Sequence, residues 1–208
     1  QDDTHQEGVG DGSGVIRNEP VLELSEFKSN GRLSYAYYAL QGERDYMEDR
    51  HVSLLDFAGK TSFFAVLDGH GGEECAALVK SLLPATLNKI EGKLHDDKAI
   101  IDAFLEMDRH CEEMYIAGTT LTSVFILDKG DHFEVICANV GDSRSIMFHN
   151  KTIVRLSNDH KPTLPDEIDR ITNAGGYVAQ VGPMYRVNGS LALSRAFGDW
   201  IYKMRRQL

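Results

Sequence analysis

The chain has few basic residues, little cysteine and no long apolar run, and each shortage excludes a class of protein. It has 22 lysines and arginines against 32 aspartates and glutamates, for a formal net charge of −10. That charge repels nucleic acid and anionic membrane surfaces, so we expect neither as a partner. No apolar run approaches the roughly 20 residues that cross a bilayer, and no secretory signal opens the chain.

Cysteine is limited to Cys75, Cys111 and Cys137, an odd number of thiols spaced far apart among apolar residues. This pattern predicts reduced core thiols rather than a disulfide framework or a zinc site. Reduced thiols and the missing signals together predict an intracellular protein, located in the cytoplasm or the nucleus.

What the chain does have is enough apolar residues for a core. Its 208 residues are 42% hydrophobic, which suits one globular domain. The first 20 residues are different, because they combine five acids and four glycines with almost nothing apolar. We therefore predict a disordered tail over residues 1–31 and one domain over residues 32–208.

Periodicity predicts an α+β fold. Aromatic and β-branched runs predict strands at 32–40, 50–57, 62–68, 119–128, 132–140 and 144–150. Helical spacing predicts helices over 71–90, 96–115 and 165–176. Strands, then two helices, then strands indicate sheets packed face to face with helices outside.

Three further local features of the secondary structure are predicted. Pro84 is expected to end or kink the first helix. After Tyr177 the chain reads as loop. The second helix should start at an aspartate cap and turn one apolar face to the core, formed by Ile101, Phe104, Leu105, Cys111 and Met114.

Acidic side chains gather where three predicted strands meet their turns. They are Glu48 and Asp49 in GERDYMEDR, Asp68 in LDGHGG, and Asp142 in NVGDSR. Carboxylate and carbonyl oxygens suit hard cations such as Mg²⁺ or Mn²⁺. The Gly69 carbonyl could join them, because no side chain stands in its way. If these loops converge, they form a divalent-metal site.

Arg44 and His70 add the chemistry of phosphate esters. Arg44 could hold two phosphate oxygens with its planar fork, and His70 could pass a proton to a leaving alkoxide near neutral pH. Two metals roughly 3.5–4 Å apart would activate a bridging water for in-line attack. Such a site hydrolyses a phosphate ester without a covalent nucleophile.

Each residue also has an ordinary structural interpretation. Arg44 and Glu48 could be a surface ion pair. Asp68 could cap the helix that follows it, and Asp142 could be a turn residue. The presence of all of them in one chain favours the hydrolase.

The chain resembles the metal-dependent serine/threonine protein phosphatases of type 2C, the PPM family. Matching segments follow the family's order and cover nearly everything from about residue 33 to 203: RDYMED (44–49), FFAVLDGHGG (63–72), GTTLTSVFI (118–126), ANVGDSRSIM (138–147), LSNDHKPTLPDEIDRITNAGGYV (156–178) and VNGSLALSRAFGD (187–199). The resemblance implies a central β-sandwich of antiparallel sheets flanked by α-helices. It also implies phosphoserine and phosphothreonine proteins as substrates.

The resemblance further implies a binuclear Mg²⁺ or Mn²⁺ centre. In it Asp68 would bridge the two metals, and the Gly69 carbonyl would bind one of them. Glu48 would coordinate directly or through water, with Asp49 close behind it. Asp142 matches the position of a weaker third ion in some members.

Two more roles follow from the resemblance: Arg44 would grip the substrate phosphate, and His70 would be the general acid. The segment LALSRAFGD matches a part of the family near the site. For Ser194, Arg195 and Asp199 within it we expect support of the fold.

The chain departs from the family pattern at its end. Residues 200–208 contain neither the acidic turn nor the Asp-Asn pair that complete the family's metal centre. We expect a C-terminally truncated domain, most simply a fragment of an active phosphatase. It could instead be one part of a divided enzyme, or a catalytically weak or inactive module that binds phosphoproteins through Arg44. The net charge disfavours a metal-dependent nuclease.

Overall fold

The computed structural model describes residues 23–204, which fall into an N-terminal unit ending at Met47 and a larger unit starting at Glu48. In the first unit β1 (Glu23–Ser29) pairs antiparallel with β2 (Ser34–Leu40). The tail predicted over 1–31 is therefore wrong for β1, and residues 1–22 lie outside the described residues. β1 has little apolar content of its own, but pairing with β2 satisfies its backbone. The domain boundary at residue 32 stays a prediction.

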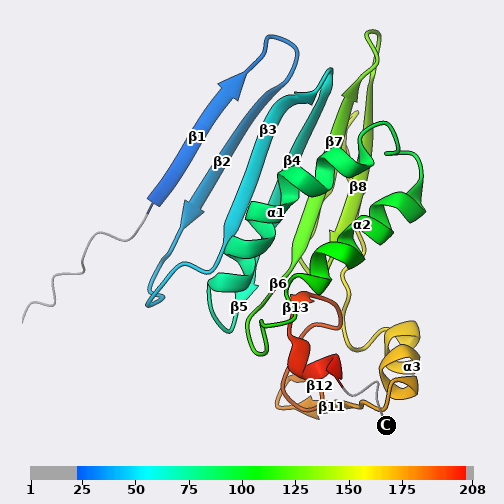
Figure 1. Ribbon diagram of the computed structural model, residues 1–208. Coiled ribbons are helices and arrows are strands. Elements are labelled where there is room, and N and C mark those ends of the chain that lie inside the picture. Colours follow the sequence, from blue (N-terminus) through cyan, green and yellow to red (C-terminus); the bar gives the residue numbers. More distant parts are fainter. Residues whose placement is uncertain (1–22, 205–208) are drawn as a thin grey trace, which may run out of the picture. The chain divides into compact units, whose positions relative to one another are not determined.

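The larger unit is built on a four-stranded antiparallel sheet with the order β3-β4-β7-β8. Its strands confirm four of the predicted ones: β3 (Arg50–Ala58), β4 (Thr61–Leu67), β7 (Leu121–Asp128) and β8 (Phe133–Val140). Alternate residues of β4 face the core, where Phe63, Ala65 and Leu67 are buried. Two helices cover that face (Figure 1).

The first of these helices, α1 (Glu74–Ile90), continues through Pro84. The expectation that Pro84 could end the helix is wrong. Buried residues on both sides of the proline, including Leu83 and Leu87, hold the helix against the sheet. Tertiary burial here outweighs the lost backbone hydrogen bond.

The second helix, α2 (Asp97–Arg109), starts as predicted, since the Asp96 side chain accepts a hydrogen bond from the Lys98 N–H at 3.0 Å. Its predicted core face is only partly right. Phe104 is buried, but Ile101 and Leu105 are 56% and 54% exposed. The helix buries a neighbouring stripe instead: Ile100, Ala103, Phe104 and Met107. Cys111 and Met114 lie beyond the helix end but pack in the core as predicted, Cys111 fully buried and Met114 partly. Two adjacent apolar stripes run along this sequence, and only packing against α1 selects between them.

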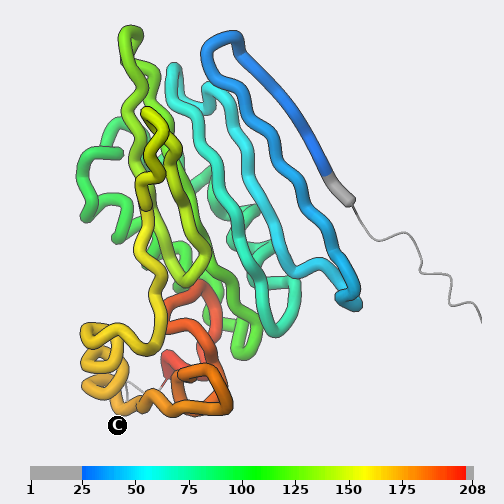
Figure 2. Tube along the Cα trace, turned by 180° about the vertical axis from the view of Figure 1, so that it is seen from behind, coloured from blue at the N-terminus to red at the C-terminus, as the bar shows by residue number. Residues whose placement is uncertain are grey.

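Beyond β8 the chain forms smaller elements. The hairpin of β9 (Ile146–His149) and β10 (Thr152–Arg155) lies on the side of the sheet opposite α1 and α2 (Figure 2). Helix α3 (Pro165–Asn173) is where it was predicted, with Pro165 at its start and Gly175 after its end.

The segment after Tyr177 is not the predicted loop. It forms the hairpin of β11 (Val178–Val181) and β12 (Met184–Val187), joined at Gly182 with φ +60°. A glycine between two short alternating runs is a hairpin signal that the prediction missed. Three two-residue strands from distant parts of the chain form a separate small sheet: β5 (Gly69–His70), β6 (Gly118–Thr119) and β13 (Phe197–Gly198). The 3₁₀ turn η1 (Trp200–Tyr202) follows β13.

The core lies between the four-stranded sheet and the helices α1 and α2. At its centre the rings of Phe63 and Phe125 are 4.9 Å apart between centroids. Cys75 and Cys111 are buried free thiols and Cys137 is half-buried, so the thiols are unbridged as predicted. Over residues 23–204, antiparallel sheets with three α-helices confirm the α+β class.

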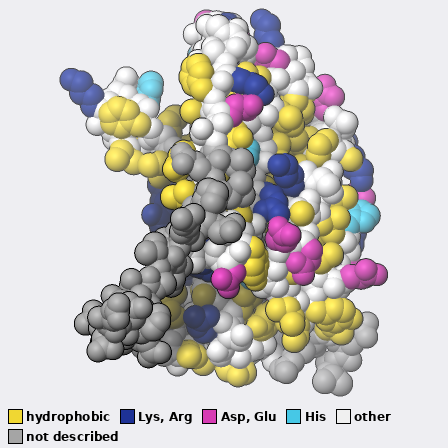
Figure 3. Space-filling model, turned by 90° about the vertical axis from the view of Figure 1, so that its left-hand side faces the viewer, with side chains coloured by type: hydrophobic (Ala, Val, Ile, Leu, Met, Phe, Trp, Pro, Cys, Tyr) yellow, Lys and Arg dark blue, Asp and Glu magenta, His cyan; other side chains and the backbone are white. Residues whose placement is uncertain are grey.

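None of the helices among the described residues has the length and apolar character needed to cross a membrane. On the face drawn in Figure 3, acidic, basic and hydrophobic side chains are interspersed.

Packing of α1 makes a direct prediction. Leu83→Ala should destabilise the fold by about 2–5 kcal/mol, because it leaves a cavity at a fully buried position. Leu105→Ala on the exposed side of α2 is the matched control and should cost less than about 1 kcal/mol. Urea unfolding followed by circular dichroism measures both. Equal losses would show that α2 packs through the face first predicted.

Candidate functional site

Asp68 stands at the end of β4, where its backbone is fixed by the neighbouring strand. The Asp68 N–H donates to the Thr120 hydroxyl at 3.1 Å, and the Thr120 N–H donates to the Asp68 carbonyl at 3.0 Å. The side chain does not cap α1, because the residue at that N-cap is Glu73. The structural alternative for Asp68 is therefore wrong, and its carboxylate is available for another role.

The pKa of Asp68 is raised above its ordinary value. The protein around the carboxylate removes part of its hydration, and the negative charges of Asp49, Asp142 and Glu48 add to the effect, while His70 opposes it. The structure thus brings together four of the predicted metal ligands closely enough for their charges to interact. A divalent cation would relieve this repulsion.

The turn after β4 requires glycine at position 69. A Cβ atom at this position would lie 2.5 Å from the backbone oxygen of Glu48. Glu48 is tied to the same loop, because its Oε1 accepts a hydrogen bond from the Gly72 N–H at 2.8 Å. Residues without side chains allow the start of β3 to lie against the turn after β4.

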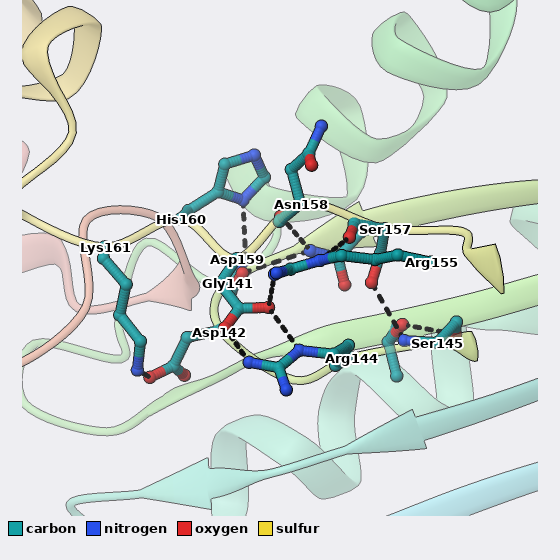
Figure 4. Close-up of polar contacts among 12 residues, drawn as sticks. Gly141, Asp142, Arg144, Ser145, Arg155, Ser157, Asn158, Asp159, His160 and Lys161 are labelled. Carbon is teal, nitrogen blue, oxygen red and sulfur yellow. Dashed lines mark hydrogen bonds and ion pairs between the residues drawn. The ribbon is translucent and has the colours of Figure 1, made fainter. Parts of the chain in front are cut away.

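Asp142 follows β8 through Gly141, whose φ is +99°. Its carboxylate forms an ion pair with Lys161 (Figure 4). Prediction from sequence missed Lys161, although it lies in the segment NDHKP that was matched to the family. The two residues are 19 positions apart, so no local spacing links them.

The same segment secures the Asp142 turn through a second set of contacts (Figure 4). Asp159 is an acceptor for Arg144 at 2.6 Å and for Arg155 at 2.5 Å. The hydrogen bond from Arg144 is the main cause of the lowered pKa of Asp159. The Gly141 N–H also donates to the His160 Nδ1 at 3.0 Å. These contacts hold the turn that carries Asp142.

His70 lies one residue beyond Gly69 and meets Asp199. The three short strands have the order β13-β6-β5, which brings together residues 129 positions apart. The His70 Nε2 is 2.7 Å from the Asp199 Oδ2. Burial lowers the pKa of His70, but the hydrogen bond to Asp199 and the charges of Asp199, Asp68 and Glu48 outweigh it, so the pKa is raised.

Arg195 has a structural contact, as expected. Its guanidinium donates to the buried Glu167 at 2.6 Å, and Arg170 reaches the same carboxylate at 2.6 Å. Burial alone would raise the pKa of Glu167, but the two arginines lower it well below the ordinary value. This pairing joins α3 to the segment that leads into β13.

Arg44 belongs to the N-terminal unit. Its side chain is exposed, and its carbonyl accepts a hydrogen bond from the Gln41 side chain at 2.7 Å. Whether Arg44 pairs with Glu48 or faces the carboxylates of the larger unit stays a prediction.

The donor chemistry suits Mg²⁺ or Mn²⁺, with several carboxylates and the backbone of Gly69 in one region. In the part of the chain that the structure describes, however, no three histidine, cysteine or acidic side chains surround one point closely enough to hold a metal ion. The donors are present, and they do not form a closed cage.

The protein phosphatase 2C family model matches residues 33–207. The chain belongs to the protein phosphatase 2C family. "Protein phosphatase 2C homolog 2" of Schizosaccharomyces pombe is 39% identical over 205 residues, covering 91% of this chain and 53% of that protein. "Protein phosphatase 1L" of Bos taurus is 39% identical over 195 residues, covering 86% of this chain and 52% of that protein. The chain thus spans about half the length of these relatives.

Solved structures of the family share this fold. The crystal structure of a phosphatase from Toxoplasma gondii matches with a TM-score of 0.67 and 27% identity, covering 79% of this chain and 64% of that one. A serine-threonine phosphatase 2C from the same organism matches with a TM-score of 0.66 and 23% identity, over 90% of this chain and 71% of that one. Protein phosphatases 2C are in general Mg²⁺- or Mn²⁺-dependent hydrolases of phosphoproteins.

The Glu167 pairing predicts a pH-dependent stability. The pKa of Glu167 is lower in the fold than its ordinary value of 4.5. The two ion pairs therefore contribute fully to the free energy of unfolding above pH 4.5, and this contribution is lost progressively as the pH falls from there toward the lowered pKa. Glu167→Gln should lower the free energy of unfolding by about 1–2 kcal/mol at pH 7. The loss is limited because water can partly re-solvate the half-exposed arginines. Urea unfolding should show a smaller difference between the variant and the wild type at pH 3 than at pH 7.

Glu106→Gln is the control, because Glu106 is an exposed partner of Lys89. It should change stability far less at either pH. A Glu167→Gln loss that stays constant from pH 7 to pH 3 would contradict the assigned ionisation.

Proposed function

We propose that this chain is a protein serine/threonine phosphatase that hydrolyses phosphoserine and phosphothreonine esters by a metal-activated water. The observation that carries the proposal is the group of interacting carboxylates around Asp68, with His70 two residues further along the chain. Membership of the protein phosphatase 2C family supports the same reaction.

Glu48, Asp49, Asp68 and the Gly69 carbonyl would hold a binuclear Mg²⁺ or Mn²⁺ centre, and Asp142 a weaker third ion. When bound there, such ions would supply the activation of a water for attack on the phosphate ester. Partial burial is the main cause of the raised pKa of Asp68, and the charges of Asp49, Asp142 and Glu48 add to it. These neighbouring carboxylates support the assignment, because a cation would relieve their repulsion.

Arg44 and His70 would act on the substrate itself. Arg44 would hold two oxygens of the transferred phosphate through its guanidinium. His70 would donate a proton to the departing seryl or threonyl oxygen, which is a poor leaving group when it departs as an alkoxide. The raised pKa of His70 supports this role, because it increases the protonated fraction near neutral pH.

A second candidate is a phosphoprotein-binding module that is catalytically weak or inactive. Two observations favour it. Among the described residues no three ligands converge on one point, and Lys161 already neutralises Asp142. Such a module would bind phosphoprotein through Arg44 without turning it over.

Phosphate release from a phosphothreonine peptide separates the two functions. The purified chain should release phosphate with Mn²⁺ and none with EDTA. Asp68→Asn should lower the rate more than about 100-fold, because metal centres are sensitive to loss of a ligand. Asp56→Asn is the matched control, since it makes the same chemical change at an exposed bulge of β3 and should leave the rate unchanged.

No turnover by the wild-type chain, together with tight peptide binding that Arg44→Ala abolishes, would replace the enzyme by the binding module. Turnover that survives EDTA would contradict the metal-activated water.

Metal binding can be measured without activity. Isothermal titration of the chain with Mn²⁺ should detect binding that Asp68→Asn weakens at least about 10-fold. Mn²⁺ should also raise the unfolding temperature of the wild type, because it binds the folded state. Asp56→Asn should bind like the wild type. Equal affinities in wild type and Asp68→Asn would remove Asp68 from the metal centre.

A further inference from the structure

We infer that Asp199 is the positioning residue of His70: it holds the imidazole through Nε2 and reserves Nδ1 for the reaction. This inference rests on the proposed function for its catalytic consequence. The contact itself is a property of the fold. It would give Asp199 a specific role in place of general support.

Three two-residue strands create the contact. In β6, Gly118 is paired with His70 of β5 on one side and with Gly198 of β13 on the other. Asp199 directly follows Gly198, so it leaves the sheet beside His70. The hydrogen bond between the two side chains passes Gly118, the residue that separates their strands.

Gly118 is needed for this arrangement. A Cβ atom there would lie 2.5 Å from the His70 Nε2 and would also collide with the Asp199 Oδ2. The space above Gly118 is therefore the space that the hydrogen bond occupies. A side chain at this position would separate the two partners.

The Asp199 backbone is held in a conformation that aspartate adopts only at a cost. Its φ is +52°, in the left-handed region, and its N–H donates to the Ala117 carbonyl at 3.0 Å. The preceding Gly198 N–H donates to Asp108 at 2.9 Å, and Lys203 pairs with Asp108 at 2.7 Å. These contacts hold the backbone of Gly198 and Asp199 and so determine where the Asp199 carboxylate lies.

The hydrogen bonding of Asp199 differs from that of the structural acids. Glu167 and Asp159 each bind two arginines, and Asp108 binds Lys203 and a backbone N–H. Asp199 is only 2% exposed, yet among the described residues its side chain bonds His70 alone, and its buried Oδ1 makes no hydrogen bond. Burying a carboxylate for one partner is expensive, which points to function rather than stability.

The bond also determines which nitrogen can react. A carboxylate accepts a hydrogen bond, so the His70 Nε2 carries the hydrogen that it donates to Asp199. Within residues 23–204 the Nδ1 atom makes no hydrogen bond. Asp199 therefore fixes the tautomer and the orientation of the ring, and Nδ1 is the atom left to give a proton to the substrate oxygen.

Imidazole NMR tests the positioning directly. The 208-residue chain labelled with ¹⁵N-histidine contains eight histidines, and the His70 signals are those missing from His70→Ala. The wild type should show a protected Nε2–H proton and a single tautomer. Asp199→Gly should lose both, since glycine accepts the positive φ but has no carboxylate. Asp56→Asn, which also changes an aspartate at positive φ, should retain both.

Kinetics with two leaving groups test the catalytic consequence. Asp199→Asn keeps the backbone conformation, because asparagine tolerates the left-handed region. It should lower kcat for a phosphothreonine peptide about 10–100-fold with little change in KM. For p-nitrophenyl phosphate, whose leaving group needs no proton, the loss should be small. The double variant His70→Ala/Asp199→Asn should be no slower than His70→Ala alone.

Each outcome decides the inference. Identical His70 ring signals in the wild type and Asp199→Gly would overturn it. So would equal losses on both substrates, or additive losses in the double variant, because a merely structural aspartate predicts these. If the wild-type chain releases no phosphate from either substrate but the NMR contrast is present, the positioning stands and the proposed function fails.

Discussion

The close approach of backbone segments at three glycines is the constraint on which this site depends. Gly69 lets the Glu48 backbone lie beside the turn after β4, and Gly118 leaves room for the contact between His70 and Asp199. At Gly198 a Cβ atom would lie 2.7 Å from the Sγ of Cys75, so this strand lies directly against α1. Short strands with few hydrogen bonds of their own are thereby packed against the core.

The acidic side chains discussed above fall into two groups. Acids that stabilise the fold are paired with bases: Asp159 with Arg144 and Arg155, and Glu167 with Arg170 and Arg195. Asp68 differs, because its neighbours include the carboxylates Asp49, Asp142 and Glu48. Carboxylates that repel one another at one place, while Asp159 and Glu167 are paired with arginines, are what a cation site would show.

The strands and helices with strong periodicity were predictable from local sequence. β4, β7 and α3 lie close to their predicted ranges, because their apolar patterns and the flanking turn signals agree there. The errors fall where tertiary packing decides. β1 is paired with β2, which its own composition did not indicate, and α2 has two apolar stripes of which packing on α1 buries one. Pro84 remains inside α1 because burial of its neighbours outweighs the missing N–H.

The sequence by itself determined the α+β class, the acids and the histidine at the strand ends, and the resemblance to the type 2C phosphatases, because these are encoded in periodicity and in short contiguous motifs. Only the tertiary structure decided which of those residues meet. Asp199 reaches His70 across 129 positions, and Lys161 pairs with Asp142 across 19, through two-residue strands and turns that leave no periodic signal. Long-range pairing depends on how the strands are ordered in space, and a linear pattern does not contain that order.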